Sequence, residues 1–185
     1  MRDRLLAAAD ALFYEGGIHA VGIEKILERA GVAKASLYDT FGSKDALVQA
    51  YLQARQSARR SRIEAALARH AGARQKLLSV FDAAAQNMAD PGYRGCAFAR
   101  ASAEARPPEG VRAVCDDARG WLRELFGRLA REAGARSPDR LARQLMLLYD
   151  GAATGAMLEG GAEAARHARA AAQTLLDAAM PAGRR

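Results

Sequence analysis

The amino-acid sequence predicts an all-α fold of about nine helices, in which a small three-helix domain precedes a larger helical one. Apolar residues recur at helical spacing, and the strong helix formers Ala, Leu and Arg dominate the composition. Runs of Val, Ile and Thr with a two-residue period are missing, so little is available to build a sheet. Half of the 185 residues are hydrophobic, which is enough to fill a core.

Glycines divide the first part of the chain into short helices, because glycine readily adopts the backbone conformation that ends a helix. The first helix ends at Gly16-Gly17, the second at Gly31 and the third at Gly42. Ser43 then caps a fourth, longer helix, whose Asp45 suits the positive end of the helix dipole. The four expected helices cover residues 2–14, 23–30, about 34–41, and 44 to about 69.

The second half contains five further expected helices, separated by glycine and proline. Ser137-Pro138 is a strong helix start, since a capping serine precedes a proline at the first helical position. The expected helices cover about 74–89, 95–105, 109–133, 138–158 and 162–179, with a break at Arg106-Pro107-Pro108. We expect a first domain at 1–52, a link along the fourth helix to about 69, a second domain at 70–180 and a disordered tail at 181–185.

The chain carries a formal net charge of +7 and a pI of about 9.9. A basic balance fits a polyanionic partner such as nucleic acid, although an Arg- and Ala-rich composition also arises from a GC-rich genome. Uncharged apolar runs of 18 residues are missing from the sequence, so we expect no membrane span. Cys96 and Cys115 lie far apart, which excludes a disulfide framework and favours a cytoplasmic location.

The segment from Ile23 to Phe41 has the layout of a helix-turn-helix, a DNA-binding motif. Gly31 provides the tight turn, and Val32 is an apolar plug between the two helices. The second helix must be short and must present a polar face to base edges in the major groove. The residues expected on or beside that face are Lys34, Ala35, Ser36, Tyr38, Asp39 and Thr40. An ordinary helical corner that touches no DNA is the alternative.

Residues 30–47, AGVAKASLYDTFGSKDAL, together with Ala11-Leu12-Phe13 and Gly16-Gly17, resemble the signature of the TetR family over about residues 2–52. This resemblance implies an all-helical, dimeric DNA-binding regulator. It implies that the Tyr38 hydroxyl donates to a DNA phosphate and that Lys44 meets a phosphate at the start of the fourth helix. It also implies backbone or base contacts for Lys34, Ala35 and Ser36, with Thr40 as a further candidate for the groove.

Three residues depart from the family pattern. Gly22 stands where Ser or Thr usually caps the second helix and contacts a phosphate, and Ala33 replaces the usual serine cap of the recognition helix. Asp39 places a negative charge where histidine or arginine is common. This carboxylate either accepts a hydrogen bond from a cytosine amino group or repels phosphate and so sharpens specificity.

The last two helices resemble the pair that forms the family's four-helix dimer interface. Their expected apolar stripes are Leu141, Leu145, Leu148, Ala152, Gly155 and Ala156 on one helix, and Ala165, Ala168, Ala172, Leu175 and Ala179 on the other. Small residues allow close helix packing. Packing within one chain is the alternative.

The family's ligand pocket lies among the central helices, so we expect a mainly apolar cavity and a small apolar effector. Tyr149 and Asp150 can supply a polar anchor. For each candidate the alternative is an ordinary place in the core. The candidate lining residues are Phe81, Met88, Phe98, Trp121, Phe126, Met146, Tyr149, Asp150 and Met157.

The predicted function is therefore a ligand-responsive repressor that binds double-stranded DNA at a palindromic operator as a homodimer. The alternative is a constitutive or redox-sensing DNA-binding protein without a small-molecule ligand. Cys96 and Cys115 have arginines near them in the sequence, which permits a redox role, whereas buried inert thiols are the plainer interpretation. We expect no enzyme, cofactor or metal site, because catalytic motifs are missing and the three histidines lack metal-ligand spacing.

Overall fold

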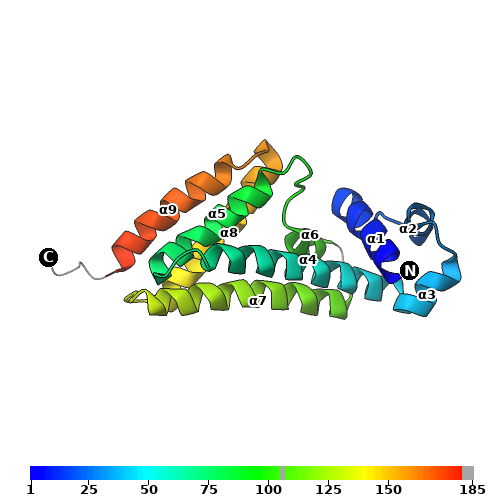
Figure 1. The fold of residues 1–185 in the computed structure, drawn as a ribbon, viewed down its shortest axis with the longest axis horizontal. Coiled ribbons are helices and arrows are strands. Elements are labelled where there is room, and N and C mark those ends of the chain that lie inside the picture. The colour runs from blue at the N-terminus through cyan, green and yellow to red at the C-terminus, as the bar shows by residue number, and fades with distance from the viewer. Residues whose placement is uncertain (105–106, 181–185) are drawn as a thin grey trace. The chain divides into compact units, whose positions relative to one another are not determined.

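The computed structural model describes residues 1–104 and 107–180, and within these ranges the chain forms nine helices and no strand (Figure 1). The all-α prediction is confirmed. The helices are α1 (Arg2–Gly16), α2 (Ile23–Ala30), α3 (Lys34–Phe41), α4 (Lys44–Leu67), α5 (Ala73–Met88), α6 (Ala97–Ala103), α7 (Glu109–Glu132), α8 (Pro138–Glu159) and α9 (Glu163–Ala179). The expected helix end at 105, the break at 106 and the tail at 181–185 lie outside the described residues. None of the helices within the described ranges is long and apolar enough to cross a bilayer.

The chain forms two compact units. Unit 1 comprises Met1–Ala58 and Ala97–Ala118, and unit 2 comprises Arg59–Cys96 and Arg119–Arg185. These units do not follow the domain limits expected from the sequence, because α6 and the start of α7 group with the N-terminal helices. Two long-range hydrogen bonds explain this grouping. Arg100 Nη1 donates to the Tyr14 carbonyl oxygen at 2.5 Å, and the Ile18 amide donates to Glu104 Oε1 at 2.7 Å.

The core of unit 1 forms because each of its first four helices has an apolar side. The Phe13 and Tyr51 rings, from α1 and α4, lie 5.5 Å apart between their centroids at an angle of 57°. Both side chains are buried, and burial of an aromatic ring is a large stabilising contribution. The fully buried residues around them are Leu5, Ala9, Ile26, Leu37, Leu47 and Leu52. This core fixes α3 through Leu37, and the rest of α3 is therefore free to face outward.

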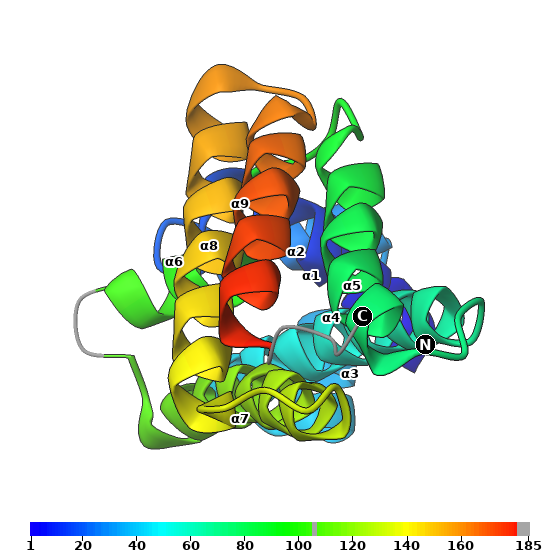
Figure 2. The same ribbon diagram turned by 90° about the vertical axis from the view of Figure 1, so that its left-hand side faces the viewer.

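In unit 2, α5, α8 and α9 pack side by side (Figure 2). A Cβ atom added to Gly155 of α8 would lie 2.8 Å from the Cβ atom of Ala164 of α9, so α8 and α9 approach closely at that point. The apolar stripes expected at a dimer interface are largely buried inside this bundle. The buried members are Leu141, Leu145, Ala152, Ala156, Ala165, Ala168 and Ala172. The dimer assignment of these residues is therefore wrong, because α5 and the pairing of α8 with α9 cover them within one chain.

Candidate functional site

The turn between α2 and α3 is held by α1. Gly31 ends α2 with a φ of 61° and a ψ of 46°, in the left-handed region that favours glycine. Arg4 Nη2 donates to the carbonyl oxygens of Ala30 at 2.6 Å and Gly31 at 2.9 Å. A Cβ atom on Gly31 would lie 2.8 Å from this guanidinium nitrogen. The glycine expected from the sequence thus suits the left-handed backbone conformation of this turn, and Arg4 is a contact to the turn that sequence reasoning missed.

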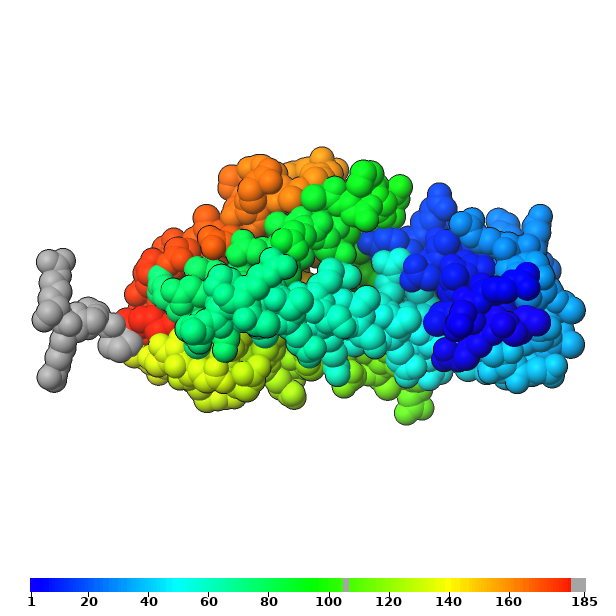
Figure 3. Space-filling view, in the orientation of Figure 1, coloured from blue at the N-terminus to red at the C-terminus, as the bar shows by residue number. Residues whose placement is uncertain are grey.

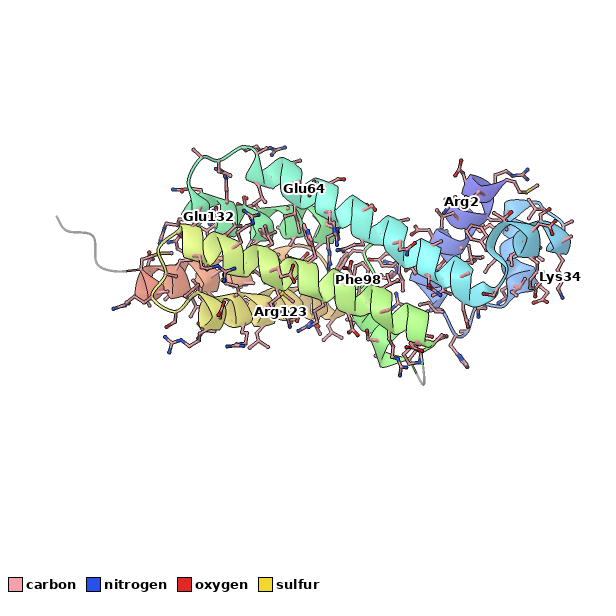
Figure 4. All side chains as sticks on the ribbon, turned by 90° about the horizontal axis from the view of Figure 1, so that it is seen from below. Arg2, Lys34, Glu64, Phe98, Arg123 and Glu132 are labelled. Atoms are coloured by element: carbon pink, nitrogen blue, oxygen red, sulfur yellow. The ribbon has the colours of Figure 1, made fainter. Side chains whose placement is uncertain are left out.

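The α3 helix lies at the surface of unit 1 (Figure 3), and its exposed side carries polar residues. Leu37 is fully buried beneath it, whereas Lys34, Ala35 and Asp39 are exposed. Tyr38 is 42% exposed. The Lys34 side chain is labelled at the start of the helix in Figure 4. The predicted DNA-contact residues of α3 therefore share an accessible face.

Ser36 and Thr40 lie half-buried at the edge of this face. The Thr40 hydroxyl donates to the Ser36 carbonyl oxygen at 2.6 Å, one helical turn earlier. Its hydrogen is therefore used within the helix, and its oxygen lone pairs remain able to accept. Thr40 is thus suited to accept from a base amino group rather than to donate to a phosphate.

The start of α4 supplies a second anchor. Ser43 Oγ accepts a hydrogen bond from the Ala46 amide at 3.1 Å, as expected for a capping serine. Lys44 is half-buried, and its Nζ atom lies 5.9 Å from the centre of the Phe13 ring. The helix N-terminus and this ammonium group together favour an anion such as a phosphate.

The two cap positions that depart from the family pattern have ordinary extended backbone. Ala33 has φ −73° and ψ 155°, and Gly22 has φ −77° and ψ 158°. In the described chain neither position provides a side-chain capping bond. Any residue can adopt these angles, so the missing caps result from residue identity and not from strain.

We expect Ala33→Ser to stabilise the protein by about 1 kcal/mol, because a serine hydroxyl at the N-cap can accept from an amide in the first turn of α3. The measurement is urea unfolding at fixed protein concentration, followed by circular dichroism. Ala35→Ser, two positions into the same helix and exposed, is the matched control and should give no gain. Equal stability of the two variants would contradict the cap assignment.

Arg55 fixes α4 to α1 within unit 1. Its Nε and Nη2 atoms donate to the two carboxylate oxygens of Asp10 at 2.7 and 2.9 Å, and its Cζ atom lies 3.5 Å from the centre of the Tyr14 ring. Burial acts to lower the Arg55 pKa, but the bond to Asp10 and the neighbouring tyrosines outweigh it, so the pKa is raised. Because the two donor nitrogens of Arg55 lie in one plane, their paired hydrogen bonds fix the orientation of the Asp10 carboxylate.

In unit 2, three of the predicted ligand-pocket residues form an aromatic cluster. The ring centroids lie 5.9 Å apart for Phe81 and Phe126, 6.3 Å for Phe81 and Tyr149, and 6.4 Å for Phe126 and Tyr149. Met88 and Met146 are buried in the same core, and Trp121 packs against it. These six candidates are therefore brought together, whereas Phe98 belongs to unit 1.

The two remaining candidates point elsewhere. Asp150 accepts from Arg119 Nη2 at 2.7 Å, so its carboxylate already has a cationic partner. Met157 is 45% exposed and lies against Gly95, where an added Cβ would be 2.7 Å from the methionine sulfur. We leave both out of the candidate pocket.

Sequence reasoning missed three polar residues on the inward side of α4. Gln56 is buried, and Arg59 and Arg60 are half-buried, with the Arg60 Cζ atom 5.1 Å from the centre of the Trp121 ring. The alternating spacing of four and three residues from Leu52 through Gln56 and Arg59 to Ile63 could have revealed them. Because Gln56 and Arg59 are polar, the helical period of inward-facing positions was not recognised there.

The thiols and histidines form no metal centre among the described residues, where no three metal-binding side chains gather. Cys115 is buried and Cys96 is half-buried, and both are free thiols. Of the histidines, His19 and His167 are exposed and His70 is half-buried.

Comparison with known proteins supports the motif assignment. Residues 5–51 match the family described as bacterial regulatory proteins, tetR family. A curated protein, the HTH-type transcriptional activator FasR of Mycolicibacterium smegmatis, is 48% identical over 52 residues. That match covers 28% of this chain and 24% of FasR, so the chain spans about a quarter of this relative's length.

Solved structures match the chain over nearly its whole length. SCO4454, a TetR-family transcriptional regulator from Streptomyces coelicolor, has a TM-score of 0.92 and 30% identity, over 97% of this chain and 96% of that one. A TetR-type transcriptional regulator from Streptomyces avermitilis has a TM-score of 0.84 and 34% identity, over 96% of this chain and 97% of that one. The likeness therefore extends from the DNA-binding motif through the second half of the chain.

Proposed function

Because this chain belongs to the TetR family of DNA-binding transcriptional regulators, we propose that it is a ligand-responsive repressor that binds a palindromic operator as a homodimer. Regulators of this family generally do not catalyse a reaction, and we propose none here. The cytoplasmic location expected from the sequence remains part of this proposal, because operator DNA is the partner.

One observation carries the proposal: α3 exposes Lys34, Ala35 and Asp39 while a single buried leucine holds it to the core. A helix held in this way can enter a major groove, where a few side chains read base edges. One copy makes few base contacts, so two copies on half-sites about 34 Å apart are needed for a specific site. The charge of +7 per chain doubles in a dimer and should make binding steeply salt-dependent.

The test is selection of bound duplexes from random DNA by the full-length protein, followed by a reporter assay with the selected site in a promoter. The proposal expects an inverted repeat with half-sites about one helical turn apart, and lower reporter output when the protein is present. Selection of asymmetric sequences would contradict the proposed palindromic operator. A rise in reporter output would contradict the proposed role as a repressor.

The outer side of α8 is the proposed dimer surface. Leu147 is 69% exposed and Leu158 is 75% exposed, with the exposed Gly151 and Thr154 between them along the helix. Spacings of four, three and four residues place these four on one side. Exposed large aliphatic residues in such a row suit a protein–protein contact, and the small residues between them allow close approach of a second copy.

We expect Leu147→Glu to convert the dimer to a monomer, because it places a charge in the apolar contact. Loss of the second half-site should then lower operator affinity by about 100-fold or more. Light scattering after size-exclusion chromatography gives the mass, and fluorescence anisotropy gives the affinity. Ala113→Glu, at an exposed position of α7, should leave both unchanged. If the Leu147→Glu variant remains dimeric, the dimer interface does not lie on this side of α8.

Effector control is proposed to act through an equilibrium between two spacings of the paired DNA-binding helices. A ligand releases DNA only when it binds better to the conformation with the wrong spacing. The alternative, a constitutive or redox-sensing DNA-binding protein without a small-molecule ligand, predicts operator affinity that no small molecule changes. An operator-release titration separates the two, and sensitivity to peroxide alone would favour Cys96 as the sensor.

A further inference from the structure

The first turn of α1 contacts both ends of the recognition segment within unit 1. Arg4 Nη2 donates to the carbonyl oxygens of Ala30 and Gly31, shortly before α3 begins, at 2.6 and 2.9 Å. At the other end, the Arg2 Cζ atom lies 5.5 Å from the centre of the ring of Phe41, the last residue of α3. One turn of a neighbouring helix therefore touches the chain before α3 and at its end.

The Arg4 guanidinium bonds to backbone groups that α2 leaves open. The last carbonyl oxygens of a helix have no amide partner within it, and Ala30 is the final residue of α2. The amides of Gly31 and Val32 bond to carbonyl oxygens deeper in α2, at 3.1 and 3.2 Å, so they do not serve Ala30. Arg4 supplies the missing donor, and its positive charge suits the negative end of the α2 dipole.

Arg4 holds this turn from outside the core. Leu5, the next residue, is fully buried and anchors α1, whereas Arg4 itself is exposed. Its two bonds span 26 and 27 residues, so they tie α1 to a turn that is distant in the sequence. Leu37 is the one buried residue of the eight in α3, so the orientation of this short helix depends strongly on what holds its ends.

We propose that Arg4 is a positioning residue for operator recognition, which sets the orientation in which α3 meets the major groove. This inference rests on the proposed operator-binding function and refines it. Base edges are distinguished only when the reading side chains stand in the right place, whereas attraction to phosphates depends mainly on charge. Loss of the Arg4 contact therefore reduces the preference for the operator and not the general attraction to DNA.

The test compares Arg4→Met with Arg112→Met, which removes the same charge from an exposed position of α7 in unit 1. Fluorescence anisotropy of the full-length protein measures the affinity for the duplex that the wild type selects and for a shuffled duplex of equal length. Arg4→Met should lower the affinity for the selected duplex by about tenfold or more, because fewer molecules hold α3 in the reading orientation. Its affinity for the shuffled duplex should match that of Arg112→Met.

Salt dependence separates this role from a direct contact between Arg4 and DNA. If Arg4 itself neutralised a phosphate in each protomer, Arg4→Met would reduce the slope of log affinity against log salt by about 1.8 in the dimer. We expect instead the slope of Arg112→Met. A reduction of that size relative to Arg112→Met, or equal losses of affinity for the two duplexes, would overturn the inference.

Gly31→Asn tests the same contact without removing a charge. Asparagine tolerates the left-handed backbone of this turn, but a Cβ atom there would lie 2.8 Å from Arg4 Nη2, so the guanidinium must shift. We expect Gly31→Asn to lose selectivity as Arg4→Met does. The double variant should lose no more than either single variant, because both changes remove one interaction. Losses that add in the double variant would contradict the proposed role of Arg4.

Urea unfolding followed by circular dichroism shows whether Arg4→Met is folded at the assay temperature. If it is not, Arg4→Lys takes its place and should show a smaller loss of selectivity, because an ammonium group can still donate to one of the two carbonyl oxygens.

The symmetry of the selected site separates this inference from the function on which it rests. If the wild type prefers an inverted repeat and Arg4→Met prefers it equally, the inference fails and the proposed function stands. If the wild type prefers an asymmetric site and Arg4→Met loses that preference, the inference stands and the palindromic operator fails.

Discussion

Tyr38→Phe and Lys44→Ala are each expected to weaken operator binding by about 100-fold. In the proposed complex each change would remove one hydrogen bond to a phosphate per protomer, worth about 1.5 kcal/mol when the acceptor is charged, and the proposed dimer would lose two. Tyr38 is 42% exposed on α3, and Lys44 lies at the N-terminus of α4, so both can reach a DNA backbone without rearrangement of the core. Fluorescence anisotropy with a labelled operator measures the affinity.

The salt dependence distinguishes these two residues. Lys44→Ala should reduce the slope of log affinity against log salt by about 1.8, because two phosphate charges are no longer neutralised. Tyr38→Phe should leave the slope unchanged, since no charge is lost. Lys76→Ala in α5 is the matched control and should alter neither affinity nor slope. Unchanged affinity in both test variants would remove the basis for the proposed DNA-binding surface.

Phe81→Ala is expected to destabilise the protein by about 3–5 kcal/mol, the range for removal of a buried phenylalanine. Phe81 is fully buried and contacts both Phe126 and Tyr149, so its loss leaves a cavity lined by rings that cannot collapse easily. In a chain of this length such a loss lowers the melting temperature by roughly 10 °C.

Tyr38→Ala is the control for this stability measurement, because it truncates an exposed aromatic ring and should change stability by about 0.5 kcal/mol or less. Both variants are compared at one protein concentration, since the proposed dimer would make the melting temperature concentration-dependent. A loss below about 1 kcal/mol for Phe81→Ala would show that unit 2 repacks around the gap.

Much of unit 1 could be predicted because its signals are local. Gly31 and Gly42 end helices by backbone conformation, Ser43 caps by a short contact, and the alternation of buried and exposed residues in α3 follows its period. Each of these depends on a few neighbouring residues. The helix bounds, the motif and its outward face could therefore be read from the chain itself.

The contacts that the sequence did not reveal are long-range. Arg4 caps the turn at Gly31 from 27 residues away. Arg100 binds the Tyr14 carbonyl oxygen in α1 and Glu104 binds the Ile18 amide just after α1, each from 86 residues away. Nothing in the local pattern of an arginine states which carbonyl it will meet. The prediction that the apolar stripe of α8 lies at a dimer interface was wrong for a related reason. An apolar row shows that one side of a helix is covered, but it does not show whether the same chain or a second copy covers it.

Unit 1 is discontinuous in sequence, and this has a consequence for how the protein is made. A nascent chain that has reached residue 58 holds all of α1, α2 and α3, but the Tyr14 carbonyl and the Ile18 amide still bond to water. Their protein partners, Arg100 and Glu104, emerge from the ribosome only after α5 has been translated, a delay of about 2 to 9 s at elongation rates of roughly 5 to 20 residues per second. Hydrogen exchange at the Ile18 amide should therefore be fast in stalled nascent chains and slow once residue 118 has been released.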